Sequence, residues 1–358
     1  MNSEKVKIKK FSYFIGIDVS RNTLDYAVIQ DKQLLFHREA LNEADNITAF
    51  LQELKTLPKF TMSKAVFCME HTGIYCNHVL NAIKKVKGNV ALENALQIRN
   101  SLGVIRGKYD KIDAIRIAQY ASKNRDDLKL WVPARPALLQ LKSLFALRNR
   151  LMGTQLALRT PLKEQVTFIK KGLQVQSTKL CKKSIEAIKA DLADIEAAID
   201  LNISSDENLK RLISIIVSVP NIGRITAIQI IISTNEFKDI NNPKQFACYA
   251  GVAPFVKESG LFKGRGKVSP IANKKVKALL HICAMSAIIS KGEIKDYFIR
   301  KTTIEGKPKM LVLNAIRGKL ILRIFSCVNQ NRHYQGDYRP VDQHCLPTAQ
   351  IHEDYCLT

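Results

Sequence analysis

Two aspartates lie three positions apart in a basic stretch of the chain, Asp110 and Asp113 in "RGKYDKIDAIRIA" (106–118). Residues at this spacing share one face of a helix, so the two carboxylates would project from the same side. Like charges held this close repel unless a cation lies beside them. The pair therefore predicts either a metal site or ordinary ion pairs with basic neighbours. Those neighbours are Lys108, Lys111 and Arg116.

Two more acids end predicted strands. Asp18 ends the first apolar run, and Glu70 ends "KAVFCME". If the two strands are neighbours in one sheet, both carboxylates meet at one edge, where the helix with the aspartate pair can lie. Four such oxygen ligands suit Mg²⁺ or Mn²⁺, which take further ligands from water and phosphate. Two ions about 4 Å apart can activate an attacking oxygen and stabilise a leaving one at phosphorus.

Each acid also has a structural alternative. Asp18 could form a turn, and Glu70 could cap the helix after "HTG". Asp25, which begins the second strand, is a weaker candidate and is expected at the surface. His71 follows Glu70 and could contact a phosphate, although a hydrogen-bonded structural neighbour is the simpler expectation.

The elements that would position these acids follow a recognisable order. Three runs rich in strand formers, "YFIGIDVS", "LDYAVIQD" and "LLFHREAL", suggest a meander. An amphipathic helix, a strand ending in Glu70, a second helix, a short strand around "NVALEN" and the helix with the aspartate pair follow. This is the order of a ribonuclease H-like α/β domain, predicted over residues 1–130. The basic, then apolar, N-terminus lacks a small-residue cleavage site, which favours a core strand over a signal peptide.

Helical patterns dominate the remainder. "WVPARPA" punctuates the chain, and a helical hairpin or short coiled coil is predicted over 131–205. Its leucine and isoleucine spacing before and after Pro161 is typical of a core stripe or a dimer seam. The stripe comprises Leu144, Leu147, Leu151, Leu158, Ile185, Ile188, Leu192, Ile195 and Ile199. A mainly helical C-terminal domain is predicted over 206–332, followed by a poorly ordered tail over 333–358.

The C-terminal domain holds two features that suggest contact with phosphate. "SVPNIGRITA" has the layout of a helix-hairpin-helix turn, which would offer backbone N–H groups to a phosphate, although an ordinary packing turn fits equally well. Residues 257–277 contain seven basic side chains and one acidic one, with three glycines among them. This composition predicts a flexible loop that binds phosphate groups.

The whole chain is strongly basic. It has 56 Lys and Arg against 32 Asp and Glu, a formal net charge of +24 over 358 residues. This excess favours a polyanionic partner, with nucleic acid first and an acidic membrane surface second. No apolar run is long enough to span a bilayer. The eight cysteines form no C-x-x-C pair and are interpreted as reduced thiols of a cytoplasmic protein, not as a zinc site or disulfide framework.

Several separate motifs together resemble a known family. "FIGIDVSRNTLDYAV", "MEHTG" and "KYDKIDAIRIAQYA" resemble the RuvC-like DEDD domain of insertion-sequence transposases related to the Piv-type DNA invertases. "SVPNIGRITAIQII", "QFACYAGVAPFVKESGLFKGRGKVSPIANKKVKALL" and "IRKTTIEGKPKMLVLNAIRGKLILRIF" resemble that family's C-terminal transposase domain. The resemblance extends, in the family's order, to about residue 330.

The resemblance implies a recombinase that excises and inserts its own mobile DNA element. It places the catalytic and metal-binding acids at Asp18, Glu70, Asp110 and Asp113, and a required serine at Ser259. It also implies a structured guide, the bridge RNA, as a partner. Two departures are visible: Tyr109 stands where Thr commonly precedes the first helix acid, and Asn221 stands where the family usually has Gly in the "VPNIG" turn.

Ser259 makes chemical sense as a nucleophile only if its hydroxyl proton is removed or if a metal and cations stabilise the developing charge. The alternative is a turn serine before Gly260. Ser269 and Ser20 are weaker candidates. Basic side chains near the aspartate pair and near Ser259 are the predicted nucleic-acid contacts. They are Lys108, Lys111, Arg116, Lys257, Lys263, Arg265, Lys267, Lys274, Lys275 and Lys277.

Three functions compete for this sequence. The first is a Mg²⁺-dependent, serine-assisted DNA recombinase acting as a dimer or tetramer, because strand exchange on two duplexes needs more than one subunit. The second is a metal-dependent nuclease, such as a Holliday-junction resolvase, in which Ser259 only contacts DNA. The third is a nucleic-acid-binding protein whose acids are structural.

Overall fold

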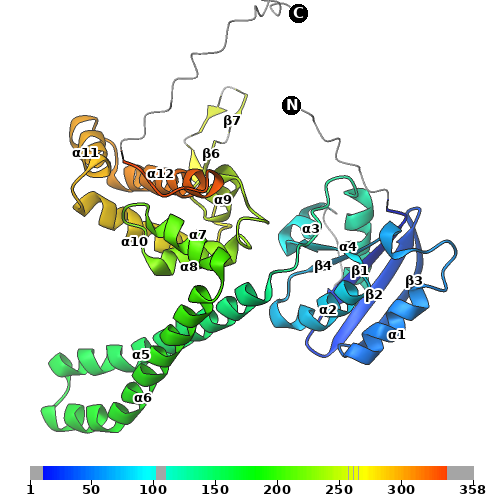
Figure 1. Ribbon diagram of the computed structural model, residues 1–358, viewed down its shortest axis with the longest axis horizontal. Coiled ribbons are helices and arrows are strands. Elements are labelled where there is room, and N and C mark those ends of the chain that lie inside the picture. The colour runs from blue at the N-terminus through cyan, green and yellow to red at the C-terminus, as the bar shows by residue number, and fades with distance from the viewer. Residues whose placement is uncertain (1–10, 102–109, 257, 261, 265, 337–358) are drawn as a thin grey trace, which may run out of the picture. The chain divides into compact units, whose positions relative to one another are not determined.

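The computed structural model describes residues 11–101, 110–256, 258–260, 262–264 and 266–336. The chain forms two compact units that divide after Pro133 (Figure 1). The predicted hairpin and the predicted C-terminal domain share the second unit. We call the two parts the N-terminal unit and the C-terminal unit.

A five-stranded sheet is the centre of the N-terminal unit. Its strands are β1 (Tyr13–Val19), β2 (Thr23–Gln30), β3 (Gln33–Leu41), β4 (Ala65–Glu70) and β5 (Asn89–Glu93). Their order is β3-β2-β1-β4-β5. The three strands of the meander are antiparallel, whereas β4 runs parallel to β1 and β5 runs parallel to β4. This mixed sheet confirms the predicted ribonuclease H-like domain.

Helices cover both faces of the sheet, which explains why β1 and β4 are almost continuously apolar. On one face, α1 (Ala44–Leu54) and α2 (Asn77–Lys85) share a core with Ile15 and Ile17 of β1. Short 3₁₀ turns, Met62–Lys64 and Gly73–Cys76, flank β4. On the other face, α3 (Ala95–Ser101) and α4 (Asp110–Lys123) pack on Phe14 of β1 and Cys68 of β4. The second face is therefore the one on which the aspartate-bearing helix lies.

A long helical hairpin begins the C-terminal unit. It is formed by α5 (Pro136–Phe168) and α6 (Lys171–Ser204), which run side by side (Figure 1). Pro161 lies inside α5 and does not end it; the turn comes at Ile169 and Lys170. Proline removes only one backbone hydrogen bond, which a long exposed helix can tolerate. Buried side chains occur only near the base of the hairpin, at Leu138, Leu141 and Phe145 of α5 and at Ile195, Ile199, Asn202 and Ile203 of α6.

Shorter helices complete the C-terminal unit around α12 (Lys309–Asn329), whose apolar stripe is buried. The others are α7 (Glu207–Val217), α8 (Arg224–Ser233), α9 (Pro243–Tyr249), α10 (Lys274–Ile289), α11 (Glu293–Ile299) and a π-helical turn, Arg300–Ile304. In the predicted helix-hairpin-helix turn, Asn221 has φ +67°. Asparagine tolerates this left-handed conformation, so it can replace the glycine expected there. Its Oδ1 also accepts hydrogen bonds from Ser286 and Ser290.

The stretch expected to be a flexible loop contains short β-ladders instead. β6 (Pro254–Phe255) pairs with β9 (Lys267–Val268), and β7 (Glu258–Ser259) pairs with β8 (Phe262–Lys263). We call residues 254–268 the serine hairpin. Gly260 at its tip has φ +54°, a conformation that glycine adopts without steric cost. The turn at Gly260 thus allows β7 and β8 to pair, although the basic composition of this stretch suggests a flexible loop.

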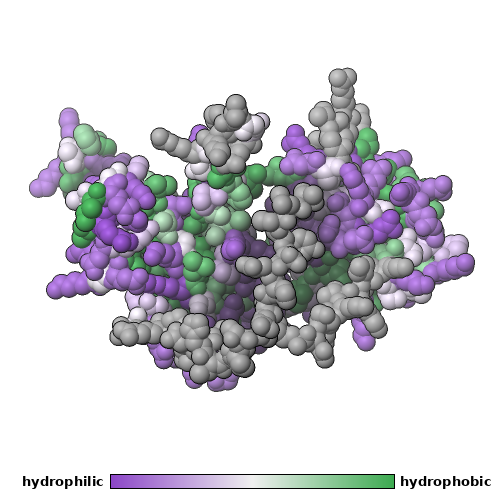
Figure 2. Space-filling view, turned by 90° about the horizontal axis from the view of Figure 1, so that it is seen from above, coloured by the Kyte–Doolittle hydropathy of each residue, from purple (hydrophilic) through white to green (hydrophobic). Residues whose placement is uncertain are grey.

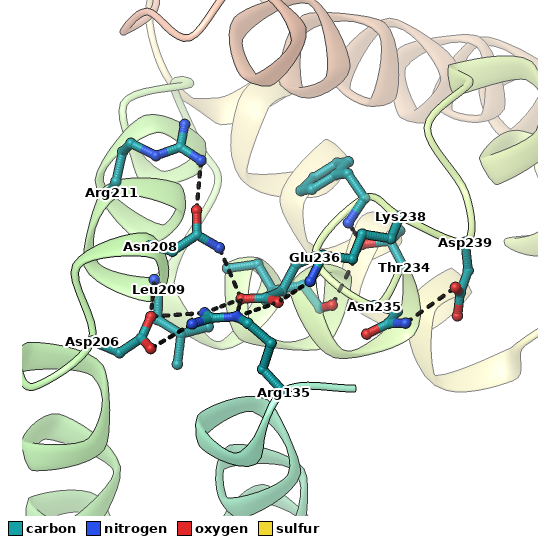
Figure 3. Close-up of polar contacts among 12 residues, drawn as sticks. Arg135, Asp206, Asn208, Leu209, Arg211, Thr234, Asn235, Glu236, Lys238 and Asp239 are labelled. Atoms are coloured by element: carbon teal, nitrogen blue, oxygen red, sulfur yellow. Dashed lines mark hydrogen bonds and ion pairs between the residues drawn. The ribbon is translucent and has the colours of Figure 1, made fainter. Parts of the chain in front are cut away.

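An ion-pair network centred on Arg135 fixes the start of α5 (Figure 3). The guanidinium donates to Asp206, the N-cap of α7, at 2.8 Å and to Glu236. Glu236 is fully buried at its side chain and also accepts from Asn208 and Lys238. Arg135 therefore joins two segments that lie far apart in the sequence.

On the face drawn in Figure 2, hydrophilic residues cover much of the described surface, with apolar residues between them. Within the described residues, none of the helices combines the length and apolar character that crossing a membrane requires. Six cysteines fall in the described part of the chain, and all are free thiols. Cys68, Cys76, Cys283 and Cys327 are buried, Cys181 is half-buried and Cys248 is exposed.

Candidate catalytic site

Acidic side chains form a row across one edge of the N-terminal sheet. Ile17 of β1 is the register partner of Met69 of β4, so the next residues, Asp18 and Glu70, lie side by side. Asp18 is also the register partner of Asp25 on β2, and Glu70 is the partner of Glu93 on β5. Because side chains alternate along a strand, these acids share the face that packs on α4. The sheet thus places Asp18 and Glu70 together, as predicted.

Gly16 allows α4 to approach this edge closely. It lies two residues before Asp18 and on the same face of β1. A Cβ atom added at Gly16 would lie 2.2 Å from the carbonyl oxygen of Ala114 and 2.3 Å from the amide nitrogen of Ala118. Backbone therefore packs on backbone at this point, and Asp113 directly precedes the contact. This close approach positions Asp113 against the strand acids. We call Asp18, Asp25, Glu70, Glu93 and Asp113 the acidic row.

The electrostatics show that Glu70 and Asp113 are neighbours. Burial raises the pKa of Glu70, and the negative charge of Asp113 raises it further. Arg116 partly compensates, since its Nη1 donates to Asp113 Oδ1 at 2.7 Å. The ion-pair alternative for Arg116 is therefore present in the structure, in its contact with Asp113. Among the described residues, no cation lowers the pKa of Glu70, so a cation at this edge would lower the energy of its ionised form.

Asp110 begins α4, and its side chain lies outside the described residues. Among the described side chains, no group of three His, Cys, Asp or Glu residues is close enough to hold a metal ion by itself. Mg²⁺ needs no such cage, because it is usually bound by one or two carboxylates and completes its shell with water and substrate phosphate. The hard oxygen donors at this edge fit that mode of binding.

Asp25 differs from its expected surface position. It is 6% exposed, and its Oδ1 lies 2.7 Å from Nε2 of His37 on β3. The reason is that β2 is an interior strand, covered by α4 on this face.

His71 is exposed, and its Nδ1 accepts a hydrogen bond from the Gly73 amide.

Glu93 is an acid of the row that the sequence reasoning missed. Burial raises its pKa, whereas a hydrogen bond with Tyr120 of α4 and the charge of Lys129 oppose the shift. A signal was available, because Glu93 ends its strand just as Glu70 ends β4. The Glu93–Tyr120 contact links β5 to α4.

Ser259 is exposed in β7, next to the Gly260 turn of the serine hairpin. The two weaker serine candidates form turns. Ser20 Oγ accepts from the Thr23 amide at 2.9 Å, and Ser269 Oγ accepts from the Ile271 amide at 3.1 Å. Ser259 belongs to the C-terminal unit and the acidic row belongs to the N-terminal unit.

The predicted nucleic-acid contacts fall into three groups. Lys111, Lys267, Lys274 and Lys275 are exposed. Lys277 is half-buried, as is Arg116 in its ion pair. Lys263 lies in β8, but its side chain is outside the described residues, as are Lys108, Lys257 and Arg265.

Comparisons with known proteins give a consistent result. A model of DEDD transposases of the IS110 type, described as a transposase, matches residues 15–170. A second model, described as the transposase IS116/IS110/IS902 family, matches residues 213–298. The chain is 23% identical to the pilin gene-inverting protein of Moraxella bovis over 330 residues, which cover 90% of this chain and 97% of that protein. The pilin gene-inverting protein of Moraxella lacunata matches to the same extent.

A solved structure is also similar to the N-terminal part. It is T. thermophilus RuvC in complex with a Holliday junction substrate, 14% identical, with a TM-score of 0.27, covering 33% of this chain and 99% of that one. The strand order, and not this distant similarity, defines the fold. With family models matching both units and relatives matched along almost its whole length, the chain belongs to the IS116/IS110/IS902 family of transposases, DNA recombinases related to the pilin gene-inverting proteins.

Proposed function

We propose that this transposase cuts and rejoins the strands of a mobile DNA element by joint action of the acidic row and Ser259. The observation that carries the proposal is the pairing of Asp18 with Glu70 beneath α4, with Asp113 near enough to raise the pKa of Glu70. A half-buried pair of like charges is unfavourable in the free protein. Such an arrangement is typical of a site that binds a cation together with a phosphate.

Dependence on a divalent metal follows from membership of the DEDD transposases. Mg²⁺, or Mn²⁺ in its place, would be held by Asp18, Glu70, Asp110 and Asp113. When bound, such ions neutralise charge on a phosphodiester and activate the attacking oxygen. The protein contributes the geometry: Gly16 seats α4 on β1, and Arg116 restrains Asp113.

Ser259 supplies the nucleophile in this proposal. Its Oγ attacks phosphorus, an Oγ–P bond forms, and the bond from phosphorus to the leaving deoxyribose oxygen breaks. The hydroxyl proton passes to solvent, and the leaving oxygen gains a proton. The phosphoserine link conserves the energy of the phosphodiester, so a second strand end can displace the serine and restore a continuous strand. An exposed serine beside a glycine turn can be approached by a DNA backbone, which supports this role.

Two partners complete the proposal. A structured guide RNA is proposed from the family resemblance, and the net charge of +24 supports binding of nucleic acid in general. A homodimer or homotetramer is proposed because two duplexes must be cut and joined together. Apolar side chains exposed along α5 and α6 support self-association.

The decisive experiment compares Ser259→Ala with Ser269→Ala on a DNA substrate that contains an element end. We expect Ser259→Ala to abolish both the covalent protein–DNA adduct and recombination, and Ser269→Ala to retain both. Adducts would be detected by denaturing gel electrophoresis. Intact metal-dependent cleavage by Ser259→Ala, with no adduct in the unmodified protein, would instead identify a resolvase-like nuclease. Full activity of both Asp18→Ala and Asp113→Ala with Mg²⁺ would refute the metal mechanism.

A further inference from the structure

We propose that Arg317 of α12, with His281 and Lys277 of α10, binds a phosphodiester group of the DNA at the base of the serine hairpin. The site lies within the C-terminal unit and contains none of the acids of the N-terminal row. The inference deepens the proposed function, because it rests on DNA reaching the serine hairpin. It assigns the contact that would hold the strand there.

Arg317 is charged but almost fully buried. It is 5% exposed and lies on the apolar stripe of α12, next to Ile316 and one turn before Leu320 and Ile321. Burial lowers the pKa of its guanidinium. A guanidinium nevertheless keeps its proton in proteins, so the positive charge remains. A buried charge is strongly unfavourable unless an opposite charge compensates it.

The described residues provide no such charge. Arg317 Nη2 lies 2.9 Å from His281 Nδ1, and Nη1 lies 3.4 Å from Asn314 Oδ1, but neither acceptor is anionic. Its Nε is buried and has no hydrogen-bond partner. Three half-buried arginines of this unit contact carboxylates: Arg135 contacts Asp206 and Glu236, Arg148 contacts Glu196, and Arg323 contacts Glu293. Arg317 differs from them in this respect.

His281 presents a further donor. Because its Nδ1 accepts from Arg317, the neutral imidazole carries its proton on Nε2. Burial lowers the pKa of His281, and the charge of Arg317 lowers it further, so this neutral form is retained at neutral pH. Lys277 lies one helical turn before His281 on the same face of α10. The three side chains together offer N–H donors to an incoming group, which is the requirement of a phosphate.

The same side chains are connected to the serine hairpin. Asn314 Nδ2 donates to the carbonyl of Val252, two residues before β6, at 2.8 Å. Lys277 Nζ lies 3.5 Å from the position that a Cβ atom on Gly251 would occupy. Arg317 therefore contacts, through Asn314, the backbone from which the hairpin extends. A phosphate bound here would fix a DNA strand at the base of the element that bears Ser259.

The test measures binding of a fluorescent duplex DNA by anisotropy over a range of salt concentrations. It uses Ser259→Ala protein in EDTA, so that neither cleavage nor metal contributes. Arg317→Met is compared with Arg323→Met, a matched change on the same helix. We expect Arg317→Met to weaken binding about tenfold and to reduce the slope of log K against log salt by about one. Arg323→Met should leave both quantities unchanged.

Thermal unfolding of the same variants separates a binding role from a structural one. Methionine removes an uncompensated charge and keeps much of the side-chain volume, so Arg317→Met should melt no lower than the parent protein. If Arg317→Met lowers the melting temperature, Lys277→Met, which leaves Arg317 in place, becomes the binding test. Unchanged affinity and salt slope in a folded Arg317→Met or Lys277→Met variant would overturn the proposal, as would a loss confined to a single-stranded RNA of equal length.

This binding experiment is independent of the proposed serine chemistry. If Ser259 forms no adduct, the DNA-binding effect of Arg317 remains measurable. If Arg317 has no effect, the adduct assay remains valid. The two failures can therefore be told apart.

Discussion

At the scale of single residues, Glu70 shows a conflict between stability and catalysis. Its carboxylate is half-buried beside Asp113, and both effects raise its pKa, so the ionised form destabilises the fold at neutral pH. Glu70→Gln should therefore raise stability by about 1 kcal/mol while it abolishes DNA cleavage. Mg²⁺ should raise the melting temperature of the unmodified protein but not of this variant. Glu39→Gln, at an exposed position of β3, is the control.

Equal responses of both proteins to Mg²⁺ in thermal scans would contradict this assignment. A fall in the melting temperature of Glu70→Gln would likewise show that the charge is compensated in the free protein. Either result would move the cation site away from Glu70.

Arg135 gives a second prediction at this scale. Burial alone would raise the pKa of Glu236, but hydrogen bonds from Arg135, Lys238 and Asn208 outweigh it and the pKa is lowered. The Arg135 hydrogen bonds also lower the pKa of Asp206. Both carboxylates thus contribute stability that is complete at neutral pH and is lost as the pH falls below about 4. Arg135→Met should lower the free energy of unfolding by about 3 kcal/mol at neutral pH, the lower end of the range for breaking a buried ion pair, because Lys238 still contacts the buried Glu236 carboxylate.

The difference in the free energy of unfolding between the unmodified protein and Arg135→Met should become smaller in acid, because Glu236 becomes protonated there. Circular dichroism during urea unfolding at neutral pH and near pH 4 measures this gap. Arg323→Met, which breaks a pair whose carboxylate is exposed, should change stability little at either pH. A gap that stays constant with pH would contradict the network argument.

At the scale of elements, the contact between β1 and α4 determines whether the acids meet. Gly16→Val would force side-chain atoms into the backbone of Ala114 and Ala118, so α4 must move outward. Overpacking usually costs about 1–3 kcal/mol. We expect Gly16→Val to lower the free energy of unfolding by more than this and to abolish DNA cleavage. The matched change Gly153→Ala, in α5 with open space around it, should stabilise by about 0.5–1 kcal/mol. Wild-type cleavage by folded Gly16→Val would show that this contact is not needed.

At the scale of the whole molecule, the α5–α6 hairpin has too little core for its length. Leu156, Phe168 and Leu180 lie outside the predicted leucine and isoleucine stripe, and their side chains are 65%, 85% and 74% exposed. A second copy of the hairpin would bury them, so we expect the protein to be a dimer or larger. Leu156→Lys with Leu180→Lys should lower the mass measured by light scattering, whereas Leu322→Lys on α12 should not. A monomeric mass of the unmodified chain bound to nucleic acid would refute self-association.

Much of this molecule follows from the sequence alone, because the patterns concerned are local. Strand alternation and helical periodicity depend on neighbours within a few residues, which is why the order of elements and the strand-end positions of Asp18 and Glu70 could be predicted. The strand order then confirmed the ribonuclease H-like sheet. The spacing of Asp110 and Asp113 likewise needs only a helix, and α4 is one.

Tertiary structure alone decided the remaining features, because they depend on which distant segments touch. Asp25 was expected at the surface but is buried, since β2 lies inside the sheet. The proximity of Asp113 to Glu70 depends on a glycine that admits α4 to β1, and Glu93 joins the row only through the register of β5. The absence of a counter-charge at Arg317 among the described residues is equally invisible in sequence. The residue type determines whether a side chain is charged, but the tertiary contacts determine which groups compensate that charge.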